Sequence, residues 1–170
     1  DIIPFSPRFV WAYLLYYPVC FLPVLLIGSI HAFRRIALAY AFEFLVGFTV
    51  FALFPVRMIR PSFDVVDSST AVLKVIYDLD PGYNIFPSLH VANAFLVAFI
   101  FFKIRNWREG TVLTGVAILI SLSALFVKQH YVVDIAAGLL LAGIAYGVAF
   151  SWRVKKQEYR PISVRPSRTT

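Results

Sequence analysis

Charged residues are scarce in this chain: they make up 15% of its 170 residues, whereas 60% of the residues are hydrophobic. Soluble domains carry roughly 25% charged and 45–50% apolar residues, so this composition argues against a water-soluble globule. The mean hydropathy of +0.78 supports that conclusion. Cysteine is almost absent as well, and because Cys20 stands alone no disulfide can form within the chain.

Long apolar runs dominate instead, each close to the ~20 residues that a helix needs to cross a hydrocarbon layer. The five runs have 17 to 22 residues and together include 100 of the 170 residues. They cover residues 9–30, 36–56, 87–104, 111–127 and 131–152. The sequence therefore predicts an all-α fold, a polytopic bundle of transmembrane helices. We expect one transmembrane domain over residues 1–152 and a basic cytoplasmic tail over residues 153–170.

The basic residues behind the net charge of +7 are unevenly distributed along the chain. Eleven of the sixteen basic residues lie in alternate turns and in the tail, namely Arg34, Arg35, Lys103, Arg105, Arg108, Arg153, Lys155, Lys156, Arg160, Arg165 and Arg168. The positive-inside rule places these segments in the cytoplasm. The amino terminus and the long loop over residues 57–86 then lie outside, and the positive charge indicates a bilayer rather than nucleic acid as the partner.

Several residues within the runs predict local features. A kink is expected at Pro18 and Pro23, since proline removes a helical hydrogen bond. Gly143 and Gly147 form a small-xxx-small pattern, which predicts close helix packing within the chain, with a dimer face as the alternative. Glu43 lies in the middle of the second apolar run. An ionisable group there either marks a functional site or is a structural residue that is held neutral or bonded to a tyrosine.

The long outer loop carries a helix signal of its own. The segment Asp67-Ser68-Ser69-Thr70 offers N-cap residues, and apolar residues follow at helical spacing at Val72, Val75, Ile76 and Leu79. This pattern predicts a short amphipathic helix that lies at the membrane interface.

Polar residues that suit catalysis gather at the outer ends of the predicted helices, in segments 57–61, 86–90 and 128–134. His130 and Asp134 are four residues apart, so on a helix they share one face, and the carboxylate fixes the imidazole tautomer. The free imidazole nitrogen of His130 then suits nucleophilic attack on phosphorus. His90 is placed to act as the general acid that protonates the leaving oxygen.

Phosphate-binding groups accompany these residues. Pro87 and Ser88 open a predicted helix whose amino terminus presents N–H groups and partial positive charge to an anion. Nearby cations that can add charge-assisted hydrogen bonds are Arg57, Arg60 and Lys128. Together these groups would stabilise the oxygens of a phosphoryl transition state.

In these segments the chain resembles the type 2 phosphatidic acid phosphatase superfamily, whose motifs run Lys-x6-Arg-Pro, Pro-Ser-Gly-His and Ser-Arg-x5-His-x3-Asp. The matching stretches are Arg60-Pro61, Pro87-Ser88-Leu89-His90 and His130-x3-Asp134. The resemblance covers roughly residues 36–152. Within the family, Phe-Pro-Ser-Leu-His and Gln-His-Tyr-x2-Asp are most similar to the inositol phosphorylceramide synthase-like branch.

Three positions depart from the family motifs. Leu53 stands where the first motif has Lys, Leu89 replaces Gly, and Ala124 replaces the Arg of the third motif. Two phosphate-binding cations are therefore missing, and Arg57 and Lys128 are the candidates to replace them. The family core has six spans, so we expect the missing one to precede residue 9.

The resemblance implies a metal-independent lipid phosphate phosphatase or phosphotransferase without a cofactor. It implies that His130 is the nucleophile, that Asp134 orients it, that His90 is the acid, and that Arg60 and Ser88 hold the phosphate. Hydrolysis and transfer of a phospho-alcohol group to a lipid both stay open, as does the oligomeric state. Two alternatives are a non-catalytic phospholipid-binding relative and a metal or haem protein with His90, His130 and Asp134 as ligands.

Overall fold

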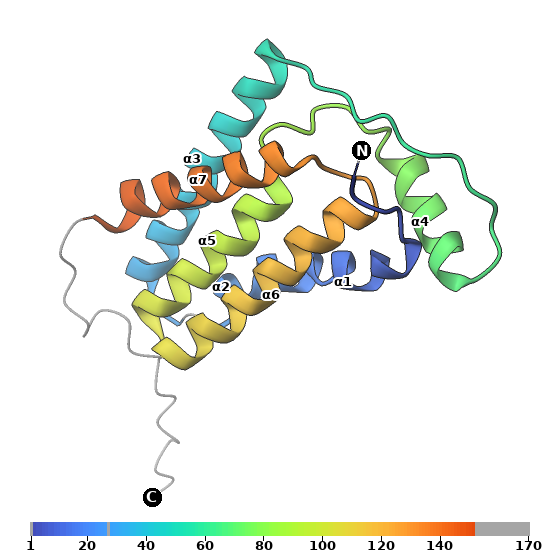
Figure 1. The fold of residues 1–170 in the computed structure, drawn as a ribbon. Helices are drawn as coiled ribbons and strands as arrows, with labels where there is room; N and C mark the ends of the chain where they lie inside the picture. The colour runs from blue at the N-terminus through green and yellow to red at the C-terminus, as the bar shows by residue number, and fades with distance from the viewer. Residues whose placement is uncertain (1, 27, 152–170) are drawn as a thin grey trace, which may run out of the picture.

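The computed structural model describes residues 2–26 and 28–151, and apart from one isolated bridge between Arg57 and Tyr83 its regular elements are all helical. They are η1 (Pro7–Phe9), α1 (Val10–Leu14), α2 (Tyr16–Leu26), α3 (Ile30–Leu53), α4 (Ser68–Leu79), α5 (Leu89–Ile104), α6 (Trp107–Phe126) and α7 (Val132–Phe150). The predicted all-α fold is confirmed (Figure 1). The basic tail expected over residues 153–170 lies outside the described residues.

Within the described ranges, four helical segments are long and apolar enough to cross a membrane: residues 7–26, which join η1, α1 and α2, and the helices α3, α6 and α7. The fifth, α5, is also apolar but has only 16 residues. These segments correspond to the five predicted runs, with shifted ends. In particular, α3 begins at Ile30, so Arg34 and Arg35 lie in its first turns and not in a connecting turn as expected. Arg35 is held there because its Nη1 donates to the Ala149 carbonyl at 2.8 Å.

The first membrane segment is interrupted, as its prolines predict. The break lies at Leu15, three residues before Pro18, where the Leu15 N–H donates to the Ala12 carbonyl at 3.2 Å. Pro18 has no N–H for the Leu14 carbonyl, and its ring crowds that carbonyl, so the regular helix stops before it. Pro23 lies within α2.

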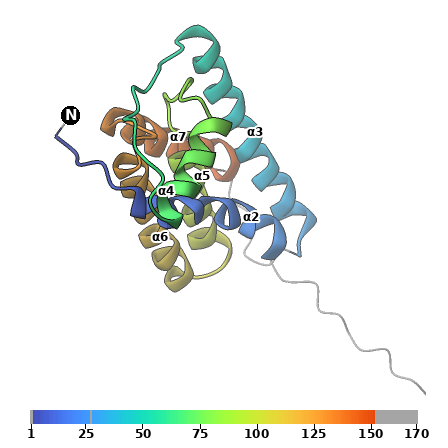
Figure 2. The same cartoon turned by 90° about the vertical axis from the view of Figure 1, so that its right-hand side faces the viewer.

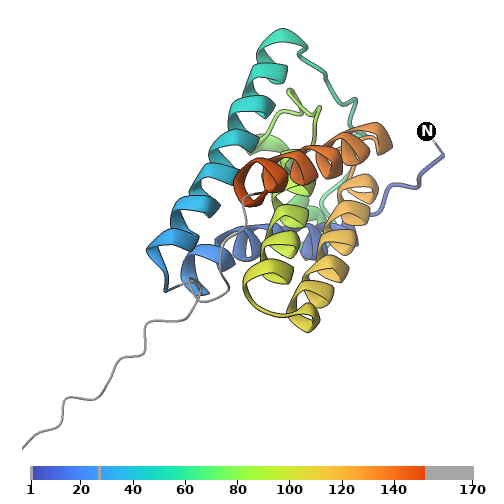
Figure 3. The ribbon, with the colours of Figure 1, turned by 90° about the vertical axis from the view of Figure 1, so that its left-hand side faces the viewer.

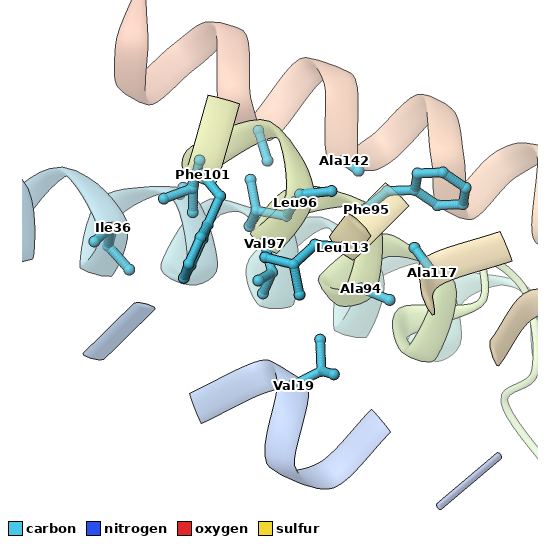
Figure 4. Packing of buried hydrophobic residues seen from close by; sticks show 14 of the residues in the cluster. Val19, Ile36, Ala94, Phe95, Leu96, Val97, Phe101, Leu113, Ala117 and Ala142 are labelled. Atoms are coloured by element: carbon cyan, nitrogen blue, oxygen red, sulfur yellow. The ribbon is translucent and has the colours of Figure 1, made fainter. Parts of the chain in front are cut away.

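The helix α5 forms the centre of the bundle. Ten of its sixteen residues are buried, and it is apolar on all sides, as expected of a helix that neighbours surround. The helices α2, α3, α6 and α7 pack around it (Figure 3). Figure 4 shows part of the resulting cluster of buried side chains, which includes Leu96, Val97 and Phe101 of α5, Val19 of α2 and Ile36 of α3.

The amino-terminal ends of α5 and α7 approach each other closely. A Cβ atom at Gly138 would lie 2.5 Å from the Ser88 carbonyl oxygen, so only glycine fits there. Next to it, the Ser88 N–H donates to the Asp134 carbonyl at 3.1 Å. By contrast, a Cβ at Gly143 or Gly147 would meet no described atom within 4 Å. The predicted close packing of those two glycines within the chain is therefore wrong, and Gly138 has that role.

The helix predicted in the long loop is confirmed as α4, and it lies against η1 and α1 (Figure 2). Asp67 caps it by accepting from the Thr70 N–H at 2.8 Å, and this hydrogen bond lowers the pKa of the Asp67 carboxyl. Its fully buried residue is Leu73, whereas Val75 and Leu79 of the predicted apolar face are exposed. Some apolar residues of α4 therefore pack into the protein interior, and others are exposed at its surface.

The contact at Gly138 predicts a position-specific effect on stability. Substitution of Gly138 by Ala should destabilise the protein by about 1–3 kcal/mol, because the new methyl group overlaps the Ser88 carbonyl and α7 must shift. Gly143→Ala is the matched control on the same helix and should leave stability unchanged or slightly higher. Thermal unfolding in detergent measures both. Equal melting temperatures for the two variants would contradict the packing described here.

Candidate active site

The three polar segments found in the sequence meet at one end of the bundle. This end holds the amino-terminal ends of α5 and α7, the carboxy-terminal end of α6 and the loop that follows α3 (Figure 1). Arg105 and Asn106 form the turn between α5 and α6 at the opposite end. The arrangement therefore separates the histidine-bearing end from that basic turn.

Two histidines face each other at this end. His90 lies in the first turn of α5, and His130 lies in the short connection between α6 and α7. The distance between His130 Nε2 and His90 Nδ1 is 3.4 Å. His130 is buried, with 6% of its surface exposed, yet both rings line an open pocket. The two imidazoles can therefore act on one bound group.

Asp134 supports the other side of His130. Its Oδ2 lies 3.6 Å from His130 Nδ1 and accepts a hydrogen bond from the Tyr131 N–H at 2.7 Å. The predicted pairing is thus present, but its helical origin is wrong, because α7 begins only at Val132 and His130 precedes it. In the described part of the chain, neither His130 Nδ1 nor Asp134 Oδ1 has a hydrogen-bond partner.

Tyr13 is a site residue that sequence reasoning missed. Its hydroxyl lies 2.8 Å from His90 Nε2, and its side chain is almost fully buried on α1. Tyr16, one turn later, places its ring edge-on to the His90 ring at 4.4 Å between centroids. No spacing pattern links a tyrosine in the first apolar run to a histidine 77 residues later, so the sequence held no signal for this contact.

Arg60 brings a nearly buried positive charge to the site. Its guanidinium donates to the Asp80 carbonyl and to Gln129 Oε1, and it lies 3.6 Å from the Asp80 carboxylate. It also stacks over the Tyr77 ring at 4.3 Å, a cation–π contact with α4. Because Gln129 directly precedes His130, Arg60 connects the long loop between α3 and α5 to the nucleophile candidate.

The histidines open into a pocket of about 500 Å³. One side is apolar and includes Phe48 and Phe51 of α3; the other side carries polar side chains, including Asp80 and Gln129. Gln129 is 1% exposed, and its Nε2 has no hydrogen-bond partner among residues 2–26 and 28–151. Such a buried donor beside two imidazoles suits an anionic ligand. Gln129 is the second residue that sequence reasoning did not single out, although it adjoins His130 in the third segment.

The remaining predicted phosphate ligands, Ser88, Arg57 and Lys128, differ in burial and in surroundings. Ser88 is fully buried next to His90 and caps α5, since its Oγ accepts from the Val91 N–H at 3.3 Å. Arg57 is exposed and stacks on Tyr83 at 4.9 Å. Lys128 lines a separate hollow of about 490 Å³ together with Arg60. Neither Arg57 nor Lys128 lines the histidine pocket.

The three positions that depart from the family motifs differ in their surroundings. Leu53, in place of Lys, is exposed at the end of α3. Ala124, in place of Arg, is fully buried in a cluster with Val10 and Tyr13. Leu89, in place of Gly, packs against Gly47 of α3. The helix α6 therefore offers no cation at the Ala124 position.

The alternative of a metal centre has no geometric support. Within the described ranges, no group of three or more His, Cys, Asp or Glu side chains is arranged to hold a metal ion. His90, His130 and Asp134 form a row, in which each imidazole faces the next group, and do not converge on one point. This arrangement suits proton transfer and nucleophilic attack.

The position of Arg60 predicts a large effect on stability. Arg60→Met should destabilise the protein by about 3 kcal/mol, because it removes charge-assisted hydrogen bonds and leaves Gln129 Oε1 and the Asp80 carbonyl unpaired. Arg57→Met, which removes an exposed cation–π contact from the same loop, should cost less than about 1 kcal/mol. Chemical unfolding in detergent measures the free energy of unfolding of both variants. Similar losses for both variants would contradict the connecting role of Arg60.

Comparison with known proteins places this geometry in a family. Curated protein sequences give no match to the chain. Among solved structures, the crystal structure of Aquifex aeolicus LpxE has a similar fold, with a TM-score of 0.61 and 16% sequence identity over 85% of this chain and 84% of that chain. The family model of the PAP2 superfamily matches residues 32–158, which include His90, His130 and Asp134. The chain therefore belongs to the PAP2 superfamily.

Proposed function

We propose that the protein is an integral-membrane lipid phosphate phosphatase that works through a phosphohistidine intermediate at the outer membrane face. Membership of the PAP2 superfamily and the shared fold support a lipid phosphatase. The observation that carries the mechanism is the row of buried side chains Asp134, His130, His90 and Tyr13 beside a pocket with one apolar wall.

His130 is the nucleophile in this proposal. The carboxylate of Asp134 faces Nδ1, which favours the tautomer with a proton on Nδ1 and a free electron pair on Nε2. Nε2 attacks phosphorus, a nitrogen–phosphorus bond forms, and the bond from phosphorus to the lipid oxygen breaks. Asp134 stabilises the positive charge that develops on the imidazole ring. Water then attacks phosphorus and releases phosphate and free His130.

His90 is the general acid. In its protonated form it donates from Nε2 to the Tyr13 oxygen and from Nδ1 to the leaving lipid oxygen. The neutral His90 that remains takes a proton from the attacking water in the second step. A phosphoryl group does not fit between two nitrogens 3.4 Å apart, so substrate binding must separate the rings.

Hydrogen-bond donors neutralise the phosphate. Arg60 and the unpaired Nε2 of Gln129 lie on the His130 side, and Ser88 begins the helix that carries His90. Fixed donors of this kind stabilise the equatorial oxygens without reorganisation during the reaction. Like Arg57 and Lys128, Arg60 does not line the pocket, but its hydrogen bond to Gln129 Oε1 connects it to the pocket lining. We assign Arg57 and Lys128 only a longer-range contribution to the positive potential.

The apolar wall of the pocket indicates an amphiphilic substrate. Phe48 and Phe51 line it from α3, a helix long enough to cross the membrane, so a lipid tail can extend from the pocket along α3. The basic turn with Arg105 and Arg108 lies at the other end of the bundle, which favours an outer active site in a single catalytic domain over residues 1–152. Transfer of the phosphoryl group to an alcohol would use the same intermediate, with the alcohol in place of water.

The nucleophile is tested by substitution and trapping. His130→Ala should lower phosphate release from lipid phosphates by ~10³-fold or more, because the covalent step is lost. The assay uses purified protein in detergent with EDTA and a panel of phosphatidate, lysophosphatidate, prenyl diphosphate and ceramide phosphate. Radiolabelled substrate should leave an acid-labile, base-stable phosphate on the wild-type protein.

His31→Ala is the matched control, since His31 is exposed in the first turn of α3. It should retain full activity. Phosphate release that survives in His130→Ala, or that requires a metal ion removed by EDTA, would contradict the mechanism. If wild-type protein retains lipid but gives neither release nor transfer, the non-catalytic binding alternative replaces it.

The acid is tested by changing the leaving group. His90→Gln should lower the rate for an alkyl phosphate by ~10²-fold or more, because an alkoxide needs a proton as it departs. The same variant should lose far less with p-nitrophenyl phosphate, whose nitrophenolate leaves without protonation. Steady-state rates for the two substrates give the comparison. Equal losses for both would exclude His90 as the acid and would leave it a role in binding.

A further inference from the structure

Glu43 is a buried acid that the proposed mechanism does not use. It lies in the middle of α3 and is completely buried. Within the described part of the chain, neither carboxyl oxygen has a hydrogen-bond partner, so the expected bond to a tyrosine is absent. An unpaired polar group is costly in an apolar interior, and replacing it by an apolar side chain would normally increase stability. A function for Glu43 would explain why the chain carries a residue that reduces its stability.

Asn93 presents a second unpaired acceptor from α5. Its side chain is fully buried, and its Nδ2 donates to the Leu89 carbonyl at 2.8 Å. Its Oδ1 has no partner among the described residues. The asparagine amide is thus held in one orientation with its acceptor oxygen unused.

The two acceptors lie at the same level of the bundle. The helices α3 and α5 run in opposite directions, and they touch where Leu89 packs on Gly47 (Figure 3). Glu43 precedes Gly47 by one turn, and Asn93 follows Leu89 by one turn. Because Glu43 and Gly47 belong to the same buried stripe of α3, both acceptors lie one turn below this contact.

A second pocket opens beside Asn93. It has a volume of about 350 Å³ and an almost entirely apolar lining, to which Tyr16 and Tyr40 contribute. Tyr16 also packs against the His90 ring, so one side chain borders both the pocket and the catalytic pair. Glu43 lines neither this pocket nor the histidine pocket, and it is related to the second pocket by its position at the level of Asn93.

An aromatic ladder on α3 connects this second pocket with the histidine pocket. Successive ring centroids are 6.3 Å apart from Tyr40 to Phe44, 5.7 Å from Phe44 to Phe48 and 5.9 Å from Phe48 to Phe51. Tyr40 and Phe44 line the second pocket, and Phe48 and Phe51 line the histidine pocket. The ladder provides a continuous apolar surface for one lipid chain.

We infer that Glu43 and Asn93 bind a hydrogen-bond donor of the lipid, a hydroxyl or an amide N–H, while its phosphate lies at His90 and His130. This inference rests on the proposed function for the position of the phosphate. One helical turn corresponds to ~5.4 Å, so the donor is carried two or three carbons from the phosphate oxygen. A plain alkyl phosphate leaves both acceptors unpaired, and a site built for a hydroxyl discriminates strongly against such a ligand.

Three synthetic ligands of equal chain length test this inference by direct binding. They are octadecyl phosphate, 3-hydroxyoctadecyl phosphate and 2-acetamidooctadecyl phosphate, and calorimetry in detergent measures their Kd for the His130→Ala variant, which cannot turn them over. At least one of the two donor-bearing ligands should bind 10-fold or more tightly than octadecyl phosphate. Adding Glu43→Met should reduce that ratio to below 2-fold, whereas Glu109→Met, at a partly exposed acid of α6 that pairs with Arg105 far from the histidines, should preserve it.

Equal affinity for the three ligands before Glu43 is changed would overturn the inference, as would a preference that persists in Glu43→Met. If Glu43→Met fails to fold, Asn93→Leu provides the same comparison. Parallel phosphate release by wild-type protein separates the two proposals. Release without any preference supports the phosphatase and overturns the acceptor site, whereas selective binding without release from any ligand supports the acceptor site and overturns the phosphatase.

Discussion

The close crossing of α5 and α7 is the constraint on which the site depends. Gly138 lets the two helices meet at the Ser88 carbonyl, and the Ser88 N–H donates to the Asp134 carbonyl beside it. This contact fixes the amino-terminal ends of both helices next to each other. Since His90 begins one helix and His130 precedes the other, their nitrogens face each other at 3.4 Å. A larger residue at Gly138 would overlap the Ser88 carbonyl and push apart the helix ends beside which the two histidines lie.

Unpaired polar atoms are concentrated where this geometry would use them. Gln129 Nε2, His130 Nδ1 and Asp134 Oδ1 all lie at the histidine end, and Glu43 with Asn93 lies one turn below. Buried polar groups without hydrogen-bond partners reduce stability. Proteins retain them at functional sites, where a ligand supplies the missing partners. The distribution is consistent with a site arranged in advance for a phosphate and for a lipid that carries a donor. The surrounding apolar core around α5 keeps these groups in place.

The sequence predicted the parts of this structure that follow from local pattern. Hydropathy located the five apolar helices, and counting them placed His90 and His130 at one end. The sequence could not predict that Tyr13 contacts His90, because that contact depends on how the helices that carry them pack together. It also assigned close packing to Gly143, since the spacing of small residues does not reveal which helix face has a neighbour. The side chain of Arg57 likewise turned out to stack on Tyr83, outside the pocket.

The central claim is that His130 attacks phosphorus in a pocket shared with His90. An experimental structure with bound vanadate, which adopts the geometry of the phosphoryl transition state, tests it most directly. We expect vanadium bonded to His130 Nε2, with equatorial oxygens near Arg60 and Gln129 and an apical oxygen hydrogen-bonded to His90. Vanadate bound instead in the separate hollow between Arg60 and Lys128, with His130 free, would contradict the account.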